Sequence, residues 1–318
     1  MVRGPIWLLT DAAMDAHHAP GHPERPDRRR AVADGVRDAA GDRLVEIGCR
    51  EATSDEIARV HAANYLELLD AFDRQGSAWL DPDTYLVPGS MLAARLAAGA
   101  TIQAAVAVAS GDAHIAVAAV RPPGHHAAAG HGSGFCLLNN VAIAVAALRA
   151  DGLAERVAIV DWDVHHGDGT QAIFDADPRT FYASTHQSPF YPGTGDAAER
   201  GHGAAAGTKH NVPLGIGDGD DPFVAAWTDQ LLPTIEAFAP DAILVSAGYD
   251  AHRSDPLAHL AVTADGYERV ARALGAAADR LGLPGVALTL EGGYDLDALR
   301  LSAAATVRGL AGGRVDPA

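Results

Sequence analysis

The sequence lacks several features that would point to a particular compartment or partner. Its 318 residues include only two cysteines, Cys49 and Cys136, which excludes a disulfide framework and a thiolate metal site. We find no apolar stretch of 18 residues and no secretory signal pattern near the N-terminus, so we expect neither a membrane partner nor export. These absences together favour a cytoplasmic protein.

Positive charge is also scarce. The formal net charge is −17, and Lys209 is the only lysine. Such acidity argues against a direct nucleic-acid partner, because binding to a phosphate backbone requires a basic surface. The acidity either keeps the protein soluble or attracts a cationic substrate, and we favour the first explanation. We attribute the single lysine to genome composition rather than to function.

What the sequence does contain is an alternation of apolar runs and amphipathic segments, with 48% hydrophobic residues in all. This alternation predicts an α/β fold with a mostly parallel sheet and helices on both faces. Strands are expected within 5–11, 44–48, 113–120, 156–163, 179–185, 241–248 and 285–292. Helices are expected within 24–40, 88–110, 137–149, 221–238, 264–281 and 296–310, and another begins with a capping box at Ser54 or Asp55. Without repeats or long linkers, we expect a single domain over residues 1–318.

Polar segments rich in glycine follow four of the expected strands. They read RPPGHH at 121–126, DWDVHHGDG at 161–169, AGYDAH at 247–252 and EGGY at 291–294. In open parallel sheets, ligands bind beyond the carboxyl ends of the strands. We therefore expect these four segments to meet at one site.

The segment DWDVHHGDGT predicts metal ligands. Side chains alternate along an extended chain, so Asp161, Asp163 and His165 share one face. An isolated Asp-x-His would more often be a salt-bridged strand end, because short motifs recur by chance. Asp250, at the end of another strand, supplies a third ligand, so a metal site becomes the favoured interpretation over a salt-bridged strand end. One histidine and two aspartates leave a coordination position open for water, which is typical of a catalytic metal site.

Two adjacent histidines, His125 and His126, are the candidate acid–base groups. They follow a rigid Pro-Pro-Gly turn, and histidine titrates near neutral pH. Asp161 and Asp168 are available to orient the two rings. Tyr294 follows two glycines that allow a tight turn, which would place its phenol over the metal. Without the other motifs, we would interpret Tyr294 as an ordinary half-buried tyrosine.

The order of these motifs resembles that of the zinc-dependent histone deacetylase superfamily, on the side of the class II enzymes and the bacterial histone deacetylase-like amidohydrolases. Further matching motifs are HPERP at 22–26, GFCLLNN at 134–140, YPGTG at 191–195 and SAGYDAHRSDPL at 246–257. The resemblance spans nearly the whole chain. It implies the arginase–deacetylase fold, with a central, mainly parallel, eight-stranded sheet flanked by helices.

The resemblance also implies a role for each candidate residue. Zinc would be bound by Asp163, His165 and Asp250. His126 would be the general base and acid, oriented by Asp168, and His125 would be its electrostatic partner, held by Asp161. Tyr294 would donate a hydrogen bond to the oxyanion. The residues implied for the substrate tunnel are Gly134, Phe135, Tyr191 and Leu257.

Potassium ions are a further implication of the resemblance. The first would be structural and lie beside the zinc-binding strand. The residues that match this site are Asp161, Asp163, His165, Ser184 and Thr185. The residues that match a second potassium site are Phe174, Asp177 and Thr180.

We expect a zinc-dependent amide hydrolase that releases acetate from acetyl-lysine in a protein or peptide. Iron(II) or cobalt(II) would also suit two oxygen ligands and one nitrogen ligand. The main alternative is an acetylpolyamine amidohydrolase, whose polycationic substrate would suit the net charge. A glutamate at position 257 would resemble the polyamine-selective pattern of the family. The leucine that is present therefore favours acetyl-lysine as the substrate. Asp83 or Asp255, however, could supply a carboxylate at the rim.

Two more distant alternatives belong to other functional classes. An arginase-type ureohydrolase needs two manganese ions, and Trp162 and Val164 cannot ligate the second one. A non-catalytic binding protein would not need every catalytic residue type, and all of them are present. The sequence leaves open the natural substrate, the acyl-chain length, the physiological metal and the oligomeric state.

Overall fold

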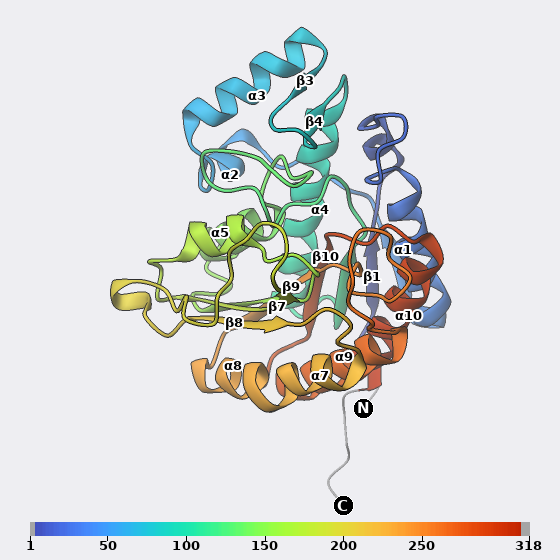
Figure 1. Ribbon diagram of the computed structural model, residues 1–318, viewed down its shortest axis with the longest axis vertical. Helices are drawn as coiled ribbons and strands as arrows, with labels where there is room; N and C mark the ends of the chain where they lie inside the picture. Colours follow the sequence, from blue (N-terminus) through green and yellow to red (C-terminus); the bar gives the residue numbers. More distant parts are fainter. Residues whose placement is uncertain (1–3, 313–318) are drawn as a thin grey trace, which may run out of the picture.

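Eight parallel strands form the central sheet of the computed structural model, which describes residues 4–312 (Figure 1). Their order across the sheet is β2-β1-β5-β10-β9-β6-β7-β8. This order confirms the expected α/β fold, and every strand pair within this eight-stranded sheet is parallel. The strands are β1 (Ile6–Leu9), β2 (Leu44–Ile47), β5 (Ile115–Ala118), β6 (Val157–Asp161), β7 (Thr180–Gln187), β8 (Lys209–Leu214), β9 (Ala242–Ala247) and β10 (Val286–Leu290).

Helices cover both faces of the sheet, and each face has its own hydrophobic core. Along β6, Ala158 and Val160 pack into one core, whereas Val157 and Ile159 pack into the other. This alternation is the side-chain period of a strand that is buried on both faces. The first core includes residues of α1 (Asp27–Ala40), α7 (Asp220–Ala225), α8 (Leu232–Phe238), α9 (Ala264–Arg280) and α10 (Leu296–Gly312). The second includes residues of α4 (Ser90–Ala109) and α5 (Asn140–Ala150).

Helix α4 corrects one expectation from the sequence. By length and composition it is apolar enough to cross a membrane, so the chain does contain an apolar stretch of that length. However, 78% of its most apolar window is buried inside the protein, between the sheet and its neighbours. The apolar composition of α4 is therefore that of a core helix.

Several elements differ from those expected. Strand β8 was missed because KHNVPL is polar and contains Pro213, which is tolerated here because β8 lies at the edge of the sheet. The capping box begins at Thr53, whose hydroxyl accepts from Glu56 N, rather than at Ser54 or Asp55. The expected helix that begins near Ser54 is present as α2 (Ser54–Ala58), and the expected helix within 221–238 consists of α7, the π-helical turn Ala226–Leu231 and α8. Among the elements missed are α3 (Ala63–Gln75), α6 (Asp168–Phe174), β3 (Ala78–Trp79) and β4 (Tyr85–Leu86).

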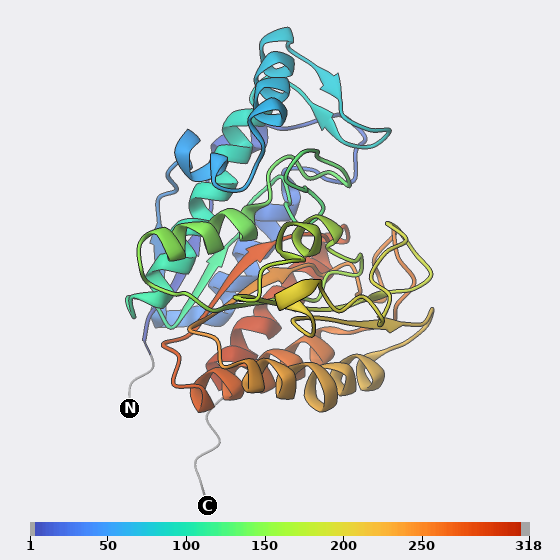
Figure 2. The same cartoon turned by 90° about the vertical axis from the view of Figure 1, so that its left-hand side faces the viewer.

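The sheet order brings the four polar segments together. Strands β5, β10, β9 and β6, which precede these segments, are consecutive neighbours in the sheet. Helix α3 and the β3–β4 hairpin project beyond the body of the sheet, in light blue and cyan at the top of Figure 2. The described residues form one α/β domain, and the expected boundaries at 1 and 318 lie outside them.

Candidate metal centre and active site

Three side chains at the ends of β6 and β9 form a group with metal-ligand geometry. The ligand atoms of Asp163, His165 and Asp250 all lie within 4.8 Å of one another. His165 Nδ1 is 3.1 Å from Asp163 Oδ1 and 3.2 Å from Asp250 Oδ2. Both carboxylates are completely buried. The structure thus brings together the three residues expected to hold a metal.

The electrostatics of this group favour a cation. Burial and the charge of Asp163 raise the pKa of Asp250. Burial disfavours a protonated His165, but Asp163 and Asp250 outweigh that effect and raise its pKa to about 10. Within the described part of the chain, the buried Asp250 Oδ2 accepts no hydrogen bond. Two carboxylates and an imidazole, partly unsatisfied and converging on one point, fit zinc.

The remaining oxygens of the two carboxylates are held by backbone amides. Asp163 Oδ2 accepts from Gly292 N at 2.7 Å, and Asp250 Oδ1 accepts from Val164 N at 2.9 Å. Glycine is required at 292, because a Cβ there would lie 2.0 Å from Asp250 Oδ2. These contacts fix the orientation of both carboxylates without any contribution from a metal.

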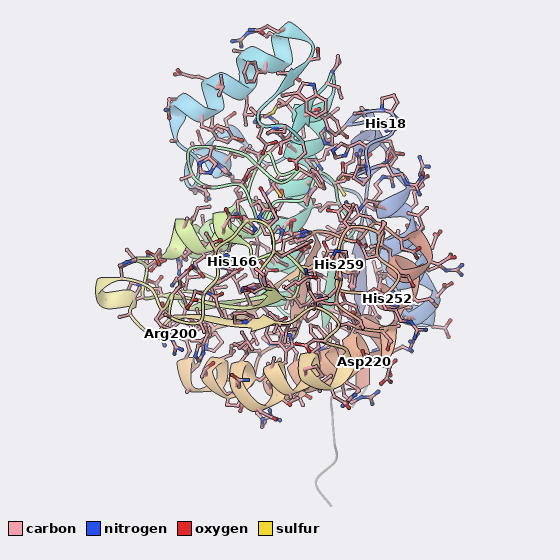
Figure 3. All side chains as sticks on the ribbon, in the orientation of Figure 1. His18, His166, Arg200, Asp220, His252 and His259 are labelled. Carbon is pink, nitrogen blue, oxygen red and sulfur yellow. The ribbon has the colours of Figure 1, made fainter. Side chains whose placement is uncertain are left out.

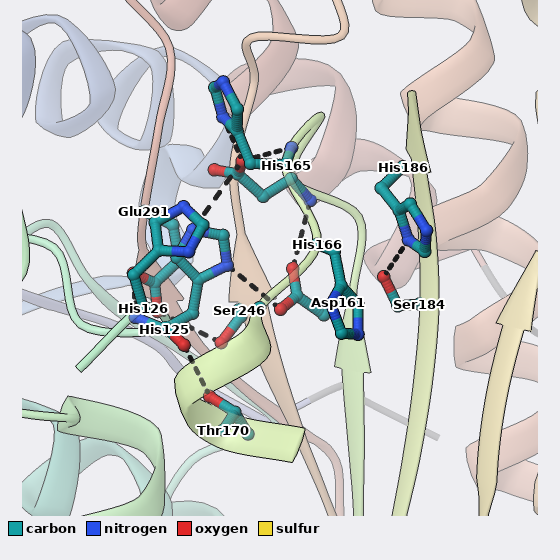
Figure 4. A network of polar contacts seen from close by, with 12 residues as sticks. His125, His126, Asp161, His165, His166, Thr170, Ser184, His186, Ser246 and Glu291 are labelled. Atoms are coloured by element: carbon teal, nitrogen blue, oxygen red, sulfur yellow. Dashed lines mark hydrogen bonds and ion pairs between the residues drawn. The ribbon is translucent and has the colours of Figure 1, made fainter. Parts of the chain in front are cut away.

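The histidine pair at 125–126 consists of two differently charged groups. His125 Nδ1 lies 3.1 Å from Asp161 Oδ2 (Figure 4). His126 Nδ1 lies 2.7 Å from Asp168 Oδ1. Burial opposes protonation of His125, but Asp163 and Asp161 outweigh it and raise its pKa. Burial and the positive charge of His125 lower the pKa of His126 to about 4, against the opposing effect of Asp168. These surroundings favour the protonated form of His125 and the neutral form of His126.

The second histidine of the zinc-strand motif, His166, does not join the ligand group. Its Nδ1 lies 2.8 Å from Thr194 Oγ1, and its Nε2 lies 3.0 Å from Gln171 Oε1. Figure 3 labels His166 beside the sheet. Both of its ring nitrogens are therefore occupied by neutral side chains, which indicates a structural role.

A cavity of about 290 Å³ leads to the histidine pair and the metal group. The rings of Phe135 and Tyr294 meet edge to face at 5.9 Å, and Tyr191 meets His126 in the same way at 5.1 Å. Tyr191 is 43% exposed and therefore lies toward the solvent. The residues expected in the tunnel all line this cavity: Gly134, Phe135, Tyr191 and Leu257.

The residues expected around the first potassium also lie together. Asp161 pairs with Ser184 in the register of β6 and β7, and both side chains are completely buried. Ser184 Oγ lies 2.9 Å from His186 Nδ1, and Thr185 Oγ1 accepts from Trp227 Nε1 at 3.1 Å. Oxygen atoms from the end of β6 and from the middle of the adjacent strand β7 are thus available to a hard cation.

The residues expected around the second potassium lie beside the ammonium group of Lys209. Its expected residues, Phe174, Asp177 and Thr180, form the turn between α6 and β7. The carbonyl oxygens of Asp177 and Thr180 accept hydrogen bonds from the ammonium of Lys209. A cation of the protein itself therefore binds where an ion was expected.

Two acidic residues of the site were missed or misplaced by the sequence reasoning. Glu291 was noted only as part of EGGY, but its Oε2 accepts from Gly124 N at 2.6 Å and from His125 N at 3.1 Å. Asp255 was expected at the rim, yet it is buried and its Oδ2 accepts from Tyr294 N at 2.7 Å. Of the two acids considered for the rim, only Asp83 lines the cavity. Both corrections involve contacts between residues far apart in sequence.

A buried arginine, Arg28, packs against the ring of Tyr294 and binds the backbone next to it. Its guanidinium carbon lies 4.8 Å from the centre of the Tyr294 ring, and its Nε donates to Gly293 O at 2.6 Å. Nη2 donates to the carbonyl of Glu291. Arg28 was expected only as a helix residue, because no local pattern in the sequence indicates its long-range contacts.

Comparisons with known proteins agree with this geometry. A model of the histone deacetylase domain matches residues 22–310. "Histone deacetylase 15" of Arabidopsis thaliana is 42% identical over 297 residues, which cover 92% of this chain and 53% of the relative. A "Probable deacetylase" of Archaeoglobus fulgidus is 40% identical, with 88% of this chain and 78% of the relative covered. The "Histone deacetylase-like amidohydrolase" of Pseudomonas aeruginosa is 38% identical, with coverage of 87% and 73%.

A solved structure agrees with the fold as well. The crystal structure of the HDA15 HD domain superposes with a TM-score of 0.91 and 39% sequence identity. The match covers 99% of this chain and 90% of that chain. This chain spans about half the length of the full Arabidopsis relative, 53%, but nearly all of the solved domain.

Proposed function

The chain belongs to the histone deacetylase family, and on that premise we propose that it is a zinc-dependent deacetylase acting on acetyl-lysine in a protein or peptide. The reaction would hydrolyse the acetyl amide to acetate and a free amine. One observation carries the proposal: the metal-ligand group of Asp163, His165 and Asp250 lies at a cavity that is lined by His165, the two adjacent histidines and Tyr294. Related proteins named deacetylase or amidohydrolase support the same reaction class.

A zinc ion held by Asp163, His165 and Asp250 would polarise the acetyl carbonyl and acidify a water molecule. His126 would accept a proton from a water molecule in the cavity. Its low pKa keeps it neutral at physiological pH, and Asp168 at its Nδ1 leaves Nε2 free to accept. Protonated at Nε2, the same imidazole can then deliver the proton to the departing amine.

Two other side chains stabilise the charge that develops on the carbonyl oxygen. Burial raises the pKa of Tyr294, and nearby carboxylates add to this effect while the charge of Arg28 opposes it. The pKa stays above its usual value, so the phenol keeps its proton and can donate it in a hydrogen bond. The imidazolium of His125 adds a fixed positive charge beside His126, with the two ring centres 4.1 Å apart. Both groups are in place before substrate binds, because buried protein contacts hold them.

The cavity walls support acetyl-lysine as the substrate. Phe135 and Tyr191 offer aromatic faces to a methylene chain, and Leu257 adds apolar surface. The competing function, acetylpolyamine hydrolysis, is favoured by the exposed carboxylate of Asp83 at the same cavity and by the net charge of −17. A second ammonium of a polyamine could pair with Asp83, as it could with a glutamate at position 257.

A substrate panel tests the proposal. The zinc-loaded protein is given acetyl-lysine peptides, N-acetylputrescine, N-acetylspermidine and longer acyl-lysine peptides, with His126→Ala as the background control. We expect the highest kcat/KM for acetyl-lysine peptides. A preference for acetylspermidine would replace the proposal by the polyamine function, and no amide hydrolysis of any substrate would reject both.

We also propose a structural potassium ion at Asp161, Asp163, His165, Ser184 and Thr185, supported by the pairing of the end of β6 with the middle of β7. A cytoplasmic location, expected from the few cysteines, is likewise a proposal. Potassium content after gel filtration in potassium-free buffer, compared between the native protein and Ser184→Ala, tests the ion. Equal potassium in both proteins would argue against Ser184 as a ligand.

A further inference from the structure

Lys209, the only lysine of the chain, is completely buried at the start of β8. Its Nζ donates to Thr180 O at 2.9 Å and to Thr208 Oγ1 at 2.7 Å, and it lies 3.5 Å from Asp177 O. A buried ammonium is costly unless its donors are satisfied, and here three oxygens surround it. The sheet register makes this contact possible, because Lys209 pairs with Tyr182 two residues beyond Thr180.

The turn that Lys209 contacts is also held by a second cation, Arg149. Arg149 Nη1 donates to Asp177 Oδ2 at 2.6 Å, and its Nη2 donates to Thr180 Oγ1 at 2.8 Å. The carbonyl of Phe174 accepts from Asp177 N at 2.9 Å. Arg149 thus binds the side chains of this turn, while Lys209 binds its main chain.

We propose that the ammonium of Lys209 is a built-in replacement for a monovalent cation at the turn 174–180, so that this turn binds no potassium. An ammonium group has the charge of potassium and nearly its size, and both bind rings of carbonyl oxygens. Three fixed positive charges, Lys209, Arg149 and Arg179, already neutralise the oxygens of this turn. A further cation would meet electrostatic repulsion and find the carbonyls of Asp177 and Thr180 taken.

The ammonium is charged under ordinary conditions. Burial lowers the pKa of Lys209 to about 8, although Asp177 and Asp175 act in the opposite direction. At neutral pH most molecules therefore carry the proton. A cation attached to the chain cannot be lost by dilution, unlike a bound ion, whose stabilising effect depends on its concentration.

The position of the turn gives the replacement of a bound ion by Lys209 a structural consequence. Helix α6 begins at Asp168, which binds His126, and ends at Phe174, where the turn begins. Lys209 therefore ties the far end of α6 to β8. The inference does not depend on catalysis, because it concerns a cation site outside the zinc group.

Two measurements test it, with Lys209→Ala and the charge-retaining control Lys209→Arg. Thallium(I), a heavy substitute for potassium, is soaked into crystals, and its positions are read from anomalous scattering. We expect no thallium at the carbonyls of Asp177 and Thr180 in the native protein, and thallium there in Lys209→Ala. Thallium at these carbonyls in the native protein would overturn the proposal.

The second measurement is thermal unfolding at constant ionic strength, with potassium exchanged for N-methylglucamine. Potassium at the first site would stabilise every variant equally. The quantity compared between variants is therefore the rise in melting temperature that potassium causes. We expect Lys209→Ala to gain at least about 2 °C more from potassium than the native protein and Lys209→Arg do. An equal response in all three proteins would contradict the proposal. If Lys209→Ala does not fold, the thallium map of the native protein decides alone.

Discussion

The carboxylate of Asp255 accepts a hydrogen bond from the backbone N–H of Tyr294, with 2.7 Å between the two atoms. The same carboxylate accepts from Leu257 N at 2.9 Å. One buried side chain thus fixes both the proposed oxyanion donor and a residue of the tunnel. Burial and the charge of Asp250 raise the pKa of Asp255 to about 7, which indicates how strongly its environment departs from water.

Asp255→Ala should therefore lower kcat by moving Tyr294, while bound zinc is retained. Because Asp255 acts through Tyr294, the effects of Asp255→Ala and Tyr294→Phe on kcat should not be additive. We expect Asp255→Ala to reduce kcat about tenfold or more in the native background and much less in a Tyr294→Phe background. A double-mutant cycle of kcat measures this coupling, and full additivity would show that Asp255 does not position Tyr294.

Tyr294→Phe removes only a hydroxyl that acts on the oxyanion. We expect kcat to fall roughly 10²- to 10³-fold, the usual effect of losing one oxyanion donor, with zinc content unchanged. The control is Tyr65→Phe, which removes a buried hydroxyl bonded to Leu137 O and should affect stability rather than kcat. Near-normal turnover of Tyr294→Phe would remove Tyr294 from the mechanism.

Leu257→Glu places a carboxylate at the cavity. We expect the ratio of kcat/KM for N-acetylspermidine to that for an acetyl-lysine peptide to rise about tenfold or more, through pairing with a second ammonium. Leu257→Gln, which has the same shape without the charge, should leave the ratio nearly unchanged. An equal shift in the two variants would assign the effect to polarity and not to charge.

Glu24 makes part of the stability dependent on pH. It is completely buried, 3.1 Å from Arg28 Nη1 and 2.5 Å from Arg121 Nη2. Burial alone would raise the pKa of Glu24, but Arg121, His17 and Arg28 outweigh it and lower the pKa from 4.5 to about 2. A carboxyl with a lowered pKa stabilises the fold above its unfolded value of 4.5, and this stabilisation disappears as the pH falls toward 2.

Glu24→Gln should therefore cost about 3–5 kcal/mol in unfolding free energy at pH 7, because two buried arginines lose their partner. The difference from the native protein should shrink by up to about 3 kcal/mol between pH 4.5 and pH 2. Urea unfolding of both proteins between pH 4.5 and pH 2 measures this difference in unfolding free energy. Glu46→Gln breaks an exposed pair with Arg37 and should cost less than about 1 kcal/mol. A pH-independent difference for Glu24→Gln would contradict the lowered pKa.

The sequence was sufficient to predict features that depend on local pattern. Seven of the sheet strands follow from apolar runs, and the motifs at 121–126, 161–169, 247–252 and 291–294 contain the residues that meet at the site. Strand β8 could not be predicted, because its pairing with β7 overrides a polar sequence with a proline. Local pattern thus predicts elements whose own residues supply the apolar face.

The features that the sequence did not predict depend on contacts between residues that are distant in sequence. The exposure of Asp255 could not be read from SDPL, because it depends on the backbone of Tyr294, 39 residues away. Lys209 was attributed to composition, since nothing near it in sequence indicates that its ammonium meets the carbonyl of Thr180, 29 residues earlier. Both residues gain their roles only when parallel strands bring separate loops together.

The central claim is that Asp163, His165 and Asp250 bind the zinc on which deacetylation depends. The most direct test measures zinc content and acetate release from an acetyl-lysine peptide in the native protein, Asp250→Ala and the exposed control Asp112→Ala. We predict about one zinc per chain and full activity in the native protein and the control, with both lost in Asp250→Ala. Full zinc occupancy or native turnover in Asp250→Ala would contradict the account.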